Sequence, residues 1–120
     1  MDKIHLSVII PAYNEEKRIA ATLLDIDKYL RQQNYDYEII VVSDGSTDNT
    51  VSVVRNLKSQ ISNLKIIDNK ENHGKGYVTK QGILEAKGEY RIYVDADNAI
   101  SMDQIEKFWP YLKEGYDVVI

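Results

Sequence analysis

The chain has 120 residues, of which 43% are hydrophobic and 28% are charged, and its net charge is −4 at neutral pH. This composition is typical of a globular protein with room for one domain. The acidic balance argues against a nucleic-acid-binding protein, which needs a basic face. The sequence contains no cysteine, which excludes disulfides and thiolate metal sites.

Apolar runs typical of buried parallel strands alternate along the chain with segments of helical period. The first predicted strand covers residues 4–10 and ends before Pro11. Asn14 then has the short polar side chain of a helix N-cap, and Glu15 and Glu16 would place negative charge in the first helical turn. That helix is expected to continue to about residue 30. The second predicted strand covers residues 37–42, and a polar turn leads from it into a helix that ends near residue 59.

The second half of the chain repeats this alternation. A strand is predicted at residues 64–67, a glycine-containing loop at 72–76, a helix at 77–86 that Gly88 ends, and a strand at 90–94. Ser101 opens a capping-box pattern for a fourth helix, which Pro110 would kink, and a fifth strand starts near Asp117. The order predicts an α/β domain with a Rossmann-like, mainly parallel sheet and helices on both faces. Because an apolar strand pattern continues up to Ile120, we expect the chain to be part of a longer protein.

Polar clusters follow three of the predicted strands, at residues 13–15, 43–48 and 95–98. Ligands of parallel α/β sheets bind outside the carboxyl ends of the strands. Since these ends share one edge of the sheet, we expect the three clusters to surround one binding site.

Asp95 and Asp97 lie at the end of the fourth predicted strand, two residues apart, so both carboxylates can face the same side. A divalent cation would relieve the repulsion between them. Carboxylate oxygens suit Mg²⁺ or Mn²⁺, with water and substrate phosphates filling the other positions. Taken alone, however, an acidic strand end that is solvated or that caps a helix explains this short pattern equally well.

The other clusters are also open to two interpretations. The turn at residues 43–48 has the composition that any strand-to-helix connection needs, although Asp44 could accept a hydrogen bond from a ligand N–H. Tyr13 and Glu15 could belong to a plain joint or to the wall of a nucleoside site.

The loop at residues 72–76 has a glycine on each side of Lys75, which could let this lysine reach a base or a phosphate. It lacks the glycine spacing and the hydroxyl residue of a Walker A motif. The sequence has two histidines, His5 and His73, far apart along the chain, so a histidine metal cluster is not expected.

Four segments of the sequence together resemble family 2 glycosyltransferases of the GT-A fold. They are residues 6–16 (LSVIIPAYNEE), 38–48 (EIIVVSDGSTD), 72–76 (NHGKG) and 94–97 (VDAD). They occur in the family's order and span nearly all of the chain. Within the family, the sequence is most similar to the polyprenyl-phosphate glycosyltransferases, and above all to the dolichyl-phosphate glucosyltransferase type, because of the NEEKR and GKG segments.

The resemblance implies that residues 1–120 form the nucleotide-sugar-binding half of a metal-dependent inverting glycosyltransferase. Such an enzyme transfers a hexose from UDP-glucose or GDP-mannose to a polyprenyl phosphate, or to a saccharide in related members. The acceptor half is expected to lie outside this chain, which would therefore bind the donor without turnover. The resemblance also implies a cytoplasmic location, at the cytoplasmic face of a membrane.

Roles for individual residues follow from the resemblance by position. The nucleoside would be held by Pro11, Tyr13, Glu15 and Asp44, with Lys75 near the base or diphosphate. Asp95 would lie near the ribose or the metal, and Asp97 would bind the metal, Mg²⁺ or Mn²⁺. These two aspartates are the candidate catalytic residues.

Two interpretations from other classes stay open. One is a phosphohydrolase whose D-x-D motif begins with a nucleophilic aspartate, although that motif usually follows an early strand and continues with glycine and threonine. The other is a nucleotide-binding module without turnover. Departures from the family pattern at Ser43, Asn98 and Ala99 leave the sugar donor open, and nothing in the sequence indicates the oligomeric state.

Overall fold

The computed structural model describes residues 3–97 and residue 107. This part of the chain contains strands β1 (Leu6–Ala12), β2 (Tyr37–Asp44), β3 (Leu64–Asn69) and β4 (Tyr90–Tyr93) and helices α1 (Ile19–Arg31), α2 (Thr50–Leu57) and α3 (Lys75–Glu85). The strands pair in the order β3-β2-β1-β4, and all of these pairs are parallel. The predicted α/β class with a parallel sheet is confirmed.

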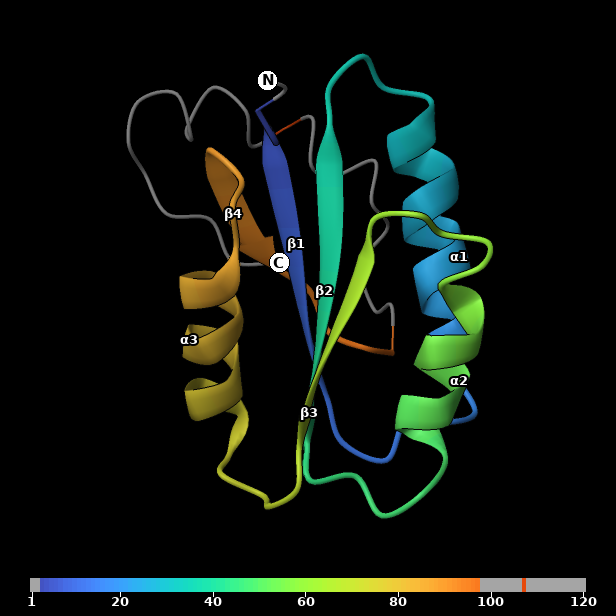
Figure 1. Ribbon diagram of the computed structural model, residues 1–120, viewed down its shortest axis with the longest axis vertical. Coiled ribbons are helices and arrows are strands. Elements are labelled where there is room, and N and C mark those ends of the chain that lie inside the picture. Colours follow the sequence, from blue (N-terminus) through green and yellow to red (C-terminus); the bar gives the residue numbers. More distant parts are fainter. Residues whose placement is uncertain (1–2, 98–106, 108–120) are drawn as a thin grey trace.

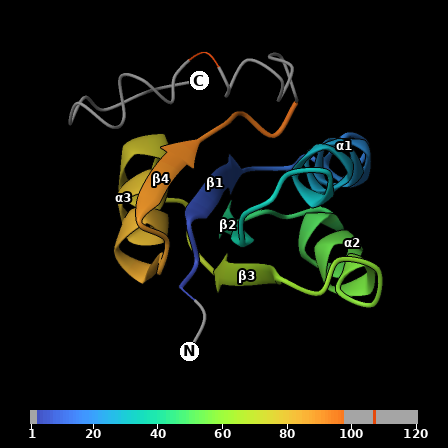
Figure 2. The ribbon, with the colours of Figure 1, turned by 90° about the horizontal axis from the view of Figure 1, so that it is seen from above.

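Helices cover both faces of the sheet, as predicted. Figure 1 shows the sheet between α3 on one side and α1 with α2 on the other, and Figure 2 shows the same three layers from above. β1, β2 and β3 are each followed by a helix that returns the chain to the start of the next parallel strand. The connections after the strands therefore gather at the carboxyl edge of the sheet, where α3 and the β1–α1 and β2–α2 loops begin.

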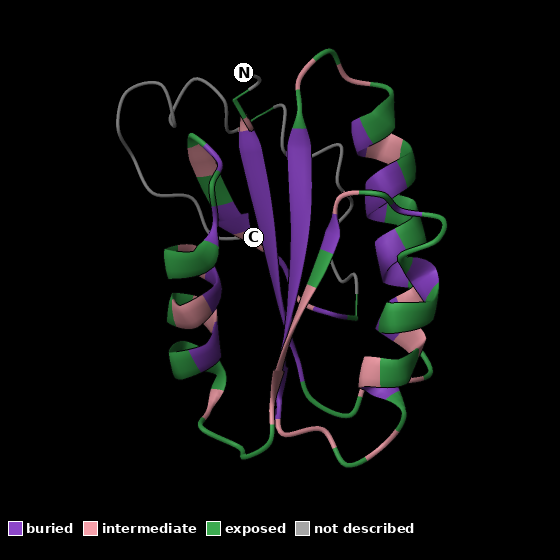
Figure 3. Ribbon diagram, viewed as in Figure 1, coloured by how far each residue is buried: buried purple, intermediate pink, exposed green. Residues whose placement is uncertain are grey.

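The central strands are buried on both faces because helices cover each of them. Every residue of β1 and β2 is buried, as Figure 3 shows, and most of them are apolar. The larger core lies between the sheet and the α1–α2 layer. The smaller core, under α3, is formed by Ile9, Ile40, Val42, Val78 and Ala86.

β1 extends two residues beyond its predicted end and includes Pro11. The carbonyl of Ile9 accepts a hydrogen bond from Val94 on the β4 side, and alternate residues of a strand direct their polar groups to the same neighbour. The missing N–H of Pro11 therefore faces the β4 side, beyond the last residue of β4. Proline is tolerated at such a position because no ladder bond is lost there.

The predicted start of α1 is wrong. Asn14 does not cap this helix; the N-cap residue is Arg18, and the first turn carries no acidic side chain. Asn14 instead adopts a left-handed backbone conformation with φ of 53°. Its side chain binds the β2–α2 loop, so a long-range contact replaces the local cap that its residue type suggests.

The buried carboxylate of Glu38 links the residues after α3 to the amino end of the sheet through hydrogen bonds. Glu38 is fully buried and accepts hydrogen bonds from Ser7 Oγ (2.6 Å), Lys65 Nζ (2.7 Å) and the backbone N–H of Lys87 (2.7 Å). Gly88 lies beyond the helix end instead of forming it, and its N–H donates to Ser7 Oγ at 2.8 Å. A Cβ at Gly88 would lie 2.4 Å from the same oxygen, so glycine permits this close approach.

The fourth helix predicted from Ser101, its kink at Pro110 and the strand near Asp117 lie outside the described residues. Among residues 3–97 and 107, no helix has the length and apolar character needed to cross a membrane.

Candidate functional site

A pocket of about 230 Å³ opens at the carboxyl edge of the sheet. Its lining includes the seven residues singled out from the sequence: Pro11, Tyr13, Glu15, Asp44, Lys75, Asp95 and Asp97. Among the described residues, Ala12, Val78 and Ala96 also line it, and these three were not predicted from the sequence. Residues that are up to 86 positions apart along the chain, from 11 to 97, thus meet in one cavity because their strands end at one edge.

Asp44 holds the loop that precedes α3. Its carboxylate accepts the backbone N–H groups of His73 (2.6 Å) and Gly74 (3.0 Å), and its backbone carbonyl accepts from the Asn72 side chain at 3.2 Å. The side chain of Asp44 is buried at the pocket wall. Each carboxylate oxygen can accept more than one hydrogen bond, so Asp44 can fix this loop and still receive a donor from a ligand.

Lys75 and Asp95 form an ion pair in the pocket, with 2.5 Å between Lys75 Nζ and Asp95 Oδ1. The ammonium also lies 5.9 Å from the centroid of the Tyr93 ring. The hydrogen bond to Asp95 raises the pKa of Lys75 above its ordinary value, although partial burial opposes this shift. One fixed positive charge is therefore already present beside the two carboxylates.

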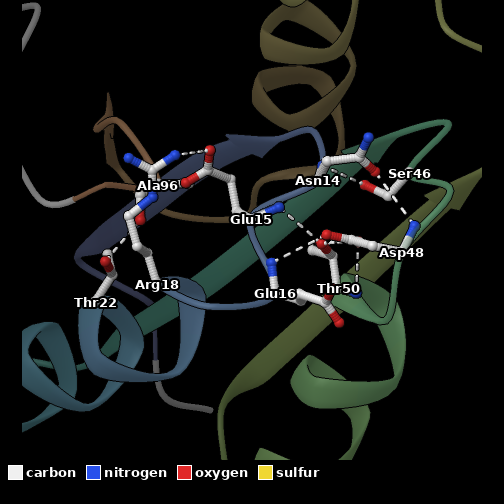
Figure 4. Close-up of polar contacts among 9 residues, drawn as sticks. All are labelled: Asn14, Glu15, Glu16, Arg18, Thr22, Ser46, Asp48, Thr50 and Ala96. Atoms are coloured by element: carbon white, nitrogen blue, oxygen red, sulfur yellow. Dashed lines mark hydrogen bonds and ion pairs between the residues drawn. The ribbon is translucent and has the colours of Figure 1, made fainter.

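Glu15 presents an unused hydrogen-bond acceptor. Its Oε1 accepts from Arg18 Nη2 at 2.6 Å, as Figure 4 shows, while Oε2 is buried and has no hydrogen-bond partner among the described residues. Buried polar atoms without a partner are rare and call for an explanation. Because Glu15 lines the pocket, its carboxylate is a candidate acceptor for a ligand hydroxyl.

The loops after β1 and β2 bind each other through reciprocal hydrogen bonds (Figure 4). Asn14 Oδ1 accepts the N–H groups of Thr47 (2.8 Å) and Asp48 (3.3 Å). In return, the N–H of Asn14 donates to Ser46 Oγ at 3.1 Å, and the N–H of Glu15 donates to Thr50 Oγ1 at 2.9 Å. These contacts fix the loop that carries Tyr13 and Glu15 relative to the strand that carries Asp44.

Thr22 of α1 reaches the segment that carries the two aspartates. Its hydroxyl donates to the backbone carbonyl of Ala96 at 2.6 Å, and the bond is buried. This residue was not predicted from the sequence, although its position carries a signal. Thr22 lies three residues after Ile19 and four before Ile26, so it is a polar residue on the apolar stripe of α1.

Asp95 and Asp97 are the residues that could hold a divalent cation. Both line the pocket and both are accessible, since Asp95 is partly buried and Asp97 is exposed. Within the described part of the chain, no group of three or more His, Asp or Glu side chains could hold a metal ion. The two carboxylates fit Mg²⁺ or Mn²⁺ in the manner of sites where substrate phosphates and water supply the remaining ligands. Lys75 would have to share Asp95 with the cation.

The family model of glycosyl transferase family 2 matches residues 7–120. The chain belongs to glycosyltransferase family 2. The resemblance inferred from the four sequence segments is therefore confirmed.

The family 2 relatives include dolichyl-phosphate β-glucosyltransferases. The protein of that name from Dictyostelium discoideum is 42% identical over 106 residues, which cover 82% of this chain and 32% of the relative. The yeast protein of that name (Saccharomyces cerevisiae) is 38% identical over 112 residues, which cover 88% of this chain and 34% of the relative. The chain thus spans about a third of the length of these curated relatives.

Solved structures of other proteins share the fold. A crystal structure of S. aureus TarS residues 1–349 in complex with UDP-GlcNAc superposes with a TM-score of 0.71 at 30% identity and covers 92% of this chain and 32% of that chain. The mannosyltransferase PcManGT from Pyrobaculum calidifontis, in complex with GDP-Man and Mn²⁺, gives a TM-score of 0.68 at 30% identity and covers 79% and 28%. The described sheet and helices therefore correspond to part of the GT-A fold.

Proposed function

We propose that this chain is the nucleotide-sugar-binding domain of a metal-dependent inverting glycosyltransferase that transfers glucose from UDP-glucose to a polyprenyl phosphate. The observation that carries the proposal is the convergence of Tyr13, Glu15, Asp44, Lys75, Asp95 and Asp97 on one pocket. The glucosyl donor and the polyprenyl acceptor are supported by the relatives named dolichyl-phosphate β-glucosyltransferase.

The pocket offers a complementary partner for the base, the ribose and the diphosphate of a nucleotide sugar. The exposed ring of Tyr13 provides an aromatic surface for a base, and the buried carboxylate of Asp44 accepts a base N–H. The unpartnered Oε2 of Glu15 accepts a hydroxyl of the ribose. The Lys75 ammonium lies where a diphosphate would approach the two aspartates and offsets part of its charge.

Mg²⁺ or Mn²⁺, when bound by Asp97 and Asp95, would supply charge neutralisation for the nucleoside diphosphate leaving group. The other contributions come from the chain itself. Lys75 orients Asp95 through their 2.5 Å ion pair. The hydrogen bonds between the loops after β1 and β2 fix Tyr13 and Glu15 in position relative to Asp44.

A polyprenyl phosphate acceptor does not need a strong general base. The second pKa of a phosphate monoester is about 6, so the attacking oxygen is already anionic at neutral pH. A saccharide hydroxyl would instead need a carboxylate base. Because a polyprenyl acceptor lies in a bilayer, the proposal includes a location at the cytoplasmic face of a membrane.

Calorimetric titration of UDP-glucose and GDP-mannose into the chain, with and without Mn²⁺, tests the proposal. We expect UDP-glucose to bind more tightly when Mn²⁺ is present, and we expect Asp97→Asn to remove this metal-dependent gain. Glu85→Gln is the matched control, because it removes one negative charge from the exposed last residue of α3, which does not line the pocket. Its titrations should match those of the unsubstituted chain.

Two outcomes would contradict the transferase assignment, and a third would change the proposed donor. A folded sample that binds neither nucleotide sugar would exclude the donor-site assignment. Release of phosphate from a generic phosphomonoester, lost in Asp95→Asn, would favour the phosphohydrolase interpretation. Stronger binding of GDP-mannose than of UDP-glucose would retain the transferase and change its donor.

A further inference from the structure

The segment that carries Asp95 and Asp97 is held from two sides. On one side, Val94 donates its N–H to Ile9 O at 3.0 Å and thereby extends the contact between β4 and β1. On the other side, the Ala96 carbonyl accepts the hydroxyl of Thr22 at 2.6 Å from α1. Figure 4 shows this contact at the same end of α1 as the Glu15–Arg18 pair.

The Thr22 hydroxyl does not make the bond that threonine commonly makes in a helix. A helical threonine often donates to the carbonyl four residues earlier. Here the Arg18 carbonyl accepts the backbone N–H of Thr22, and the hydroxyl reaches a residue 74 positions later. Both partners are nearly inaccessible, with 2% of Thr22 and 5% of Ala96 exposed, so water cannot replace the donor easily.

Fixing the Ala96 carbonyl has a direct effect on Asp97. The Ala96 carbonyl and the Asp97 nitrogen belong to one planar peptide unit, so the position of the oxygen determines the orientation of the unit that ends at the Asp97 Cα. The Asp95 side chain, by contrast, is held by its ion pair with Lys75. The two aspartates therefore have separate supports: Lys75 for the first and Thr22 for the second.

We propose that Thr22 is a positioning residue, whose hydroxyl holds the Ala96–Asp97 peptide so that the Asp97 carboxylate faces the pocket and binds the metal–diphosphate part of the donor. This inference rests on the proposed function, because it assigns a support to the same site. Thr22 does not line the pocket. It acts through the backbone of Ala96.

Thr22→Val tests the inference, since valine has nearly the same shape and lacks the hydroxyl. We expect the affinity for UDP-glucose measured with Mn²⁺ to fall by about tenfold, because the buried carbonyl without its donor turns the Ala96–Asp97 peptide toward another partner, and binding of the metal–diphosphate must then reverse a change of that order. The affinity without Mn²⁺ should be unchanged, because the Tyr13, Glu15 and Asp44 wall is not altered. Thr22→Ser keeps the hydroxyl and should retain the metal-dependent gain. If valine impairs folding, Thr22→Ala removes the same hydroxyl with a residue of higher helix propensity.

Tyr37→Phe is the matched control, because it shows whether loss of any buried hydroxyl contact of α1 is enough to remove the metal-dependent gain. The Tyr37 hydroxyl donates to Asp27 at 2.5 Å and ties α1 to the start of β2, away from the aspartate segment. This variant removes another buried hydroxyl contact of the same helix, so its stability should fall while its metal-dependent gain persists.

The outcomes separate the two proposals. Loss of the gain in Thr22→Val, with retention in Thr22→Ser and Tyr37→Phe, supports the positioning role. A full gain in Thr22→Val, equal loss in Thr22→Ser, or equal loss in Tyr37→Phe overturns that role and leaves the proposed function intact. Absence of a Mn²⁺-dependent gain in the unsubstituted chain overturns the proposed metal site, and the positioning role with it.

Discussion

Gly45 lies at the point where the β2–α2 connection passes the loop before α3. Its backbone has φ of +72°, and a Cβ built on it would lie 2.6 Å from the backbone carbon of Glu71 and 2.7 Å from the backbone nitrogen of Asn72. A backbone obstacle cannot rotate away as a flexible side chain can. Gly45→Ala must therefore displace residues 71 and 72, which adjoin the N–H groups that Asp44 holds.

Two separate penalties add in this variant. A left-handed backbone costs a residue with a Cβ about 1–2 kcal/mol. Overpacking, here against the backbone of Glu71 and Asn72, typically costs a further ~1–3 kcal/mol. We therefore expect Gly45→Ala to lower the free energy of unfolding by about 2–5 kcal/mol, a large part of the stability of a small domain.

Two other glycines in the same region separate these penalties. Gly74 has φ of 97° and ψ of 155°, but a Cβ there would meet nothing within 4 Å. Gly74→Ala should therefore show the backbone penalty alone, about 1–3 kcal/mol for this glycine-specific conformation. Gly76 lies in α3 with open space around its Cα and no positive φ. Gly76→Ala should be neutral or stabilising by up to ~1 kcal/mol, because alanine is the better helix former.

Urea unfolding followed by circular dichroism measures all three variants, and the midpoints can be compared when the m-values agree. We expect Gly76→Ala to be the most stable of the three variants, Gly74→Ala to be intermediate and Gly45→Ala to be the least stable. If Gly45→Ala were no less stable than Gly74→Ala, the close approach to Glu71 and Asn72 would not exist in solution. If Gly76→Ala were as damaging as Gly74→Ala, the backbone-strain argument would fail.

Two further predictions concern charged groups. Burial opposes ionisation of Glu38, but the hydrogen bonds from Lys65, Ser7 and Lys87 outweigh burial and hold the pKa of Glu38 below its ordinary value of 4.5. The stability that ionised Glu38 contributes is therefore complete above pH 4.5 and is lost as the pH falls through the lowered pKa. The stability difference between the unsubstituted chain and Glu38→Gln should therefore shrink on acidification, and a pH-independent difference between their urea midpoints would refute this. Lys75→Met should change the free energy of unfolding by less than about 1 kcal/mol, because the side chains of the ion pair are 59% and 46% exposed. It should nevertheless raise the affinity for Mn²⁺ alone and lower that for UDP in separate titrations, and an unchanged Mn²⁺ affinity would contradict the proposed competition for Asp95.

The layer arrangement and the membership of the pocket could be predicted because both follow from strand periodicity and the geometry of parallel sheets. Each polar cluster is local in sequence, and the strand that precedes it fixes the edge where it lies. Asp44 and Asp95 could therefore be assigned to one site without coordinates, whereas Lys75 was assigned to it through the resemblance to family 2 glycosyltransferases. Their roles with a ligand stay predictions.

Contacts between distant loops could not be predicted in this way. Asn14 has the residue type of a helix cap, but its side chain binds Thr47 and Asp48, more than thirty positions later. The same limit applies to Thr22, since a polar residue on an apolar stripe signals a buried partner without identifying Ala96. Local propensity decides what a side chain can do, whereas tertiary contacts decide which partner it meets.

The mutual binding of the loops after β1 and β2 has a consequence for recombination between family members. The backbone N–H groups of Asn14 and Glu15 donate to the hydroxyls of Ser46 and of Thr50, the first residue of α2. In return, the N–H of Thr47 depends on the Asn14 side chain. A chimera that receives one loop from a relative would combine donors and acceptors that did not arise together, leaving backbone N–H groups without partners. The two loops therefore form a single exchangeable module, and grafts that alter donor specificity should transfer both at once.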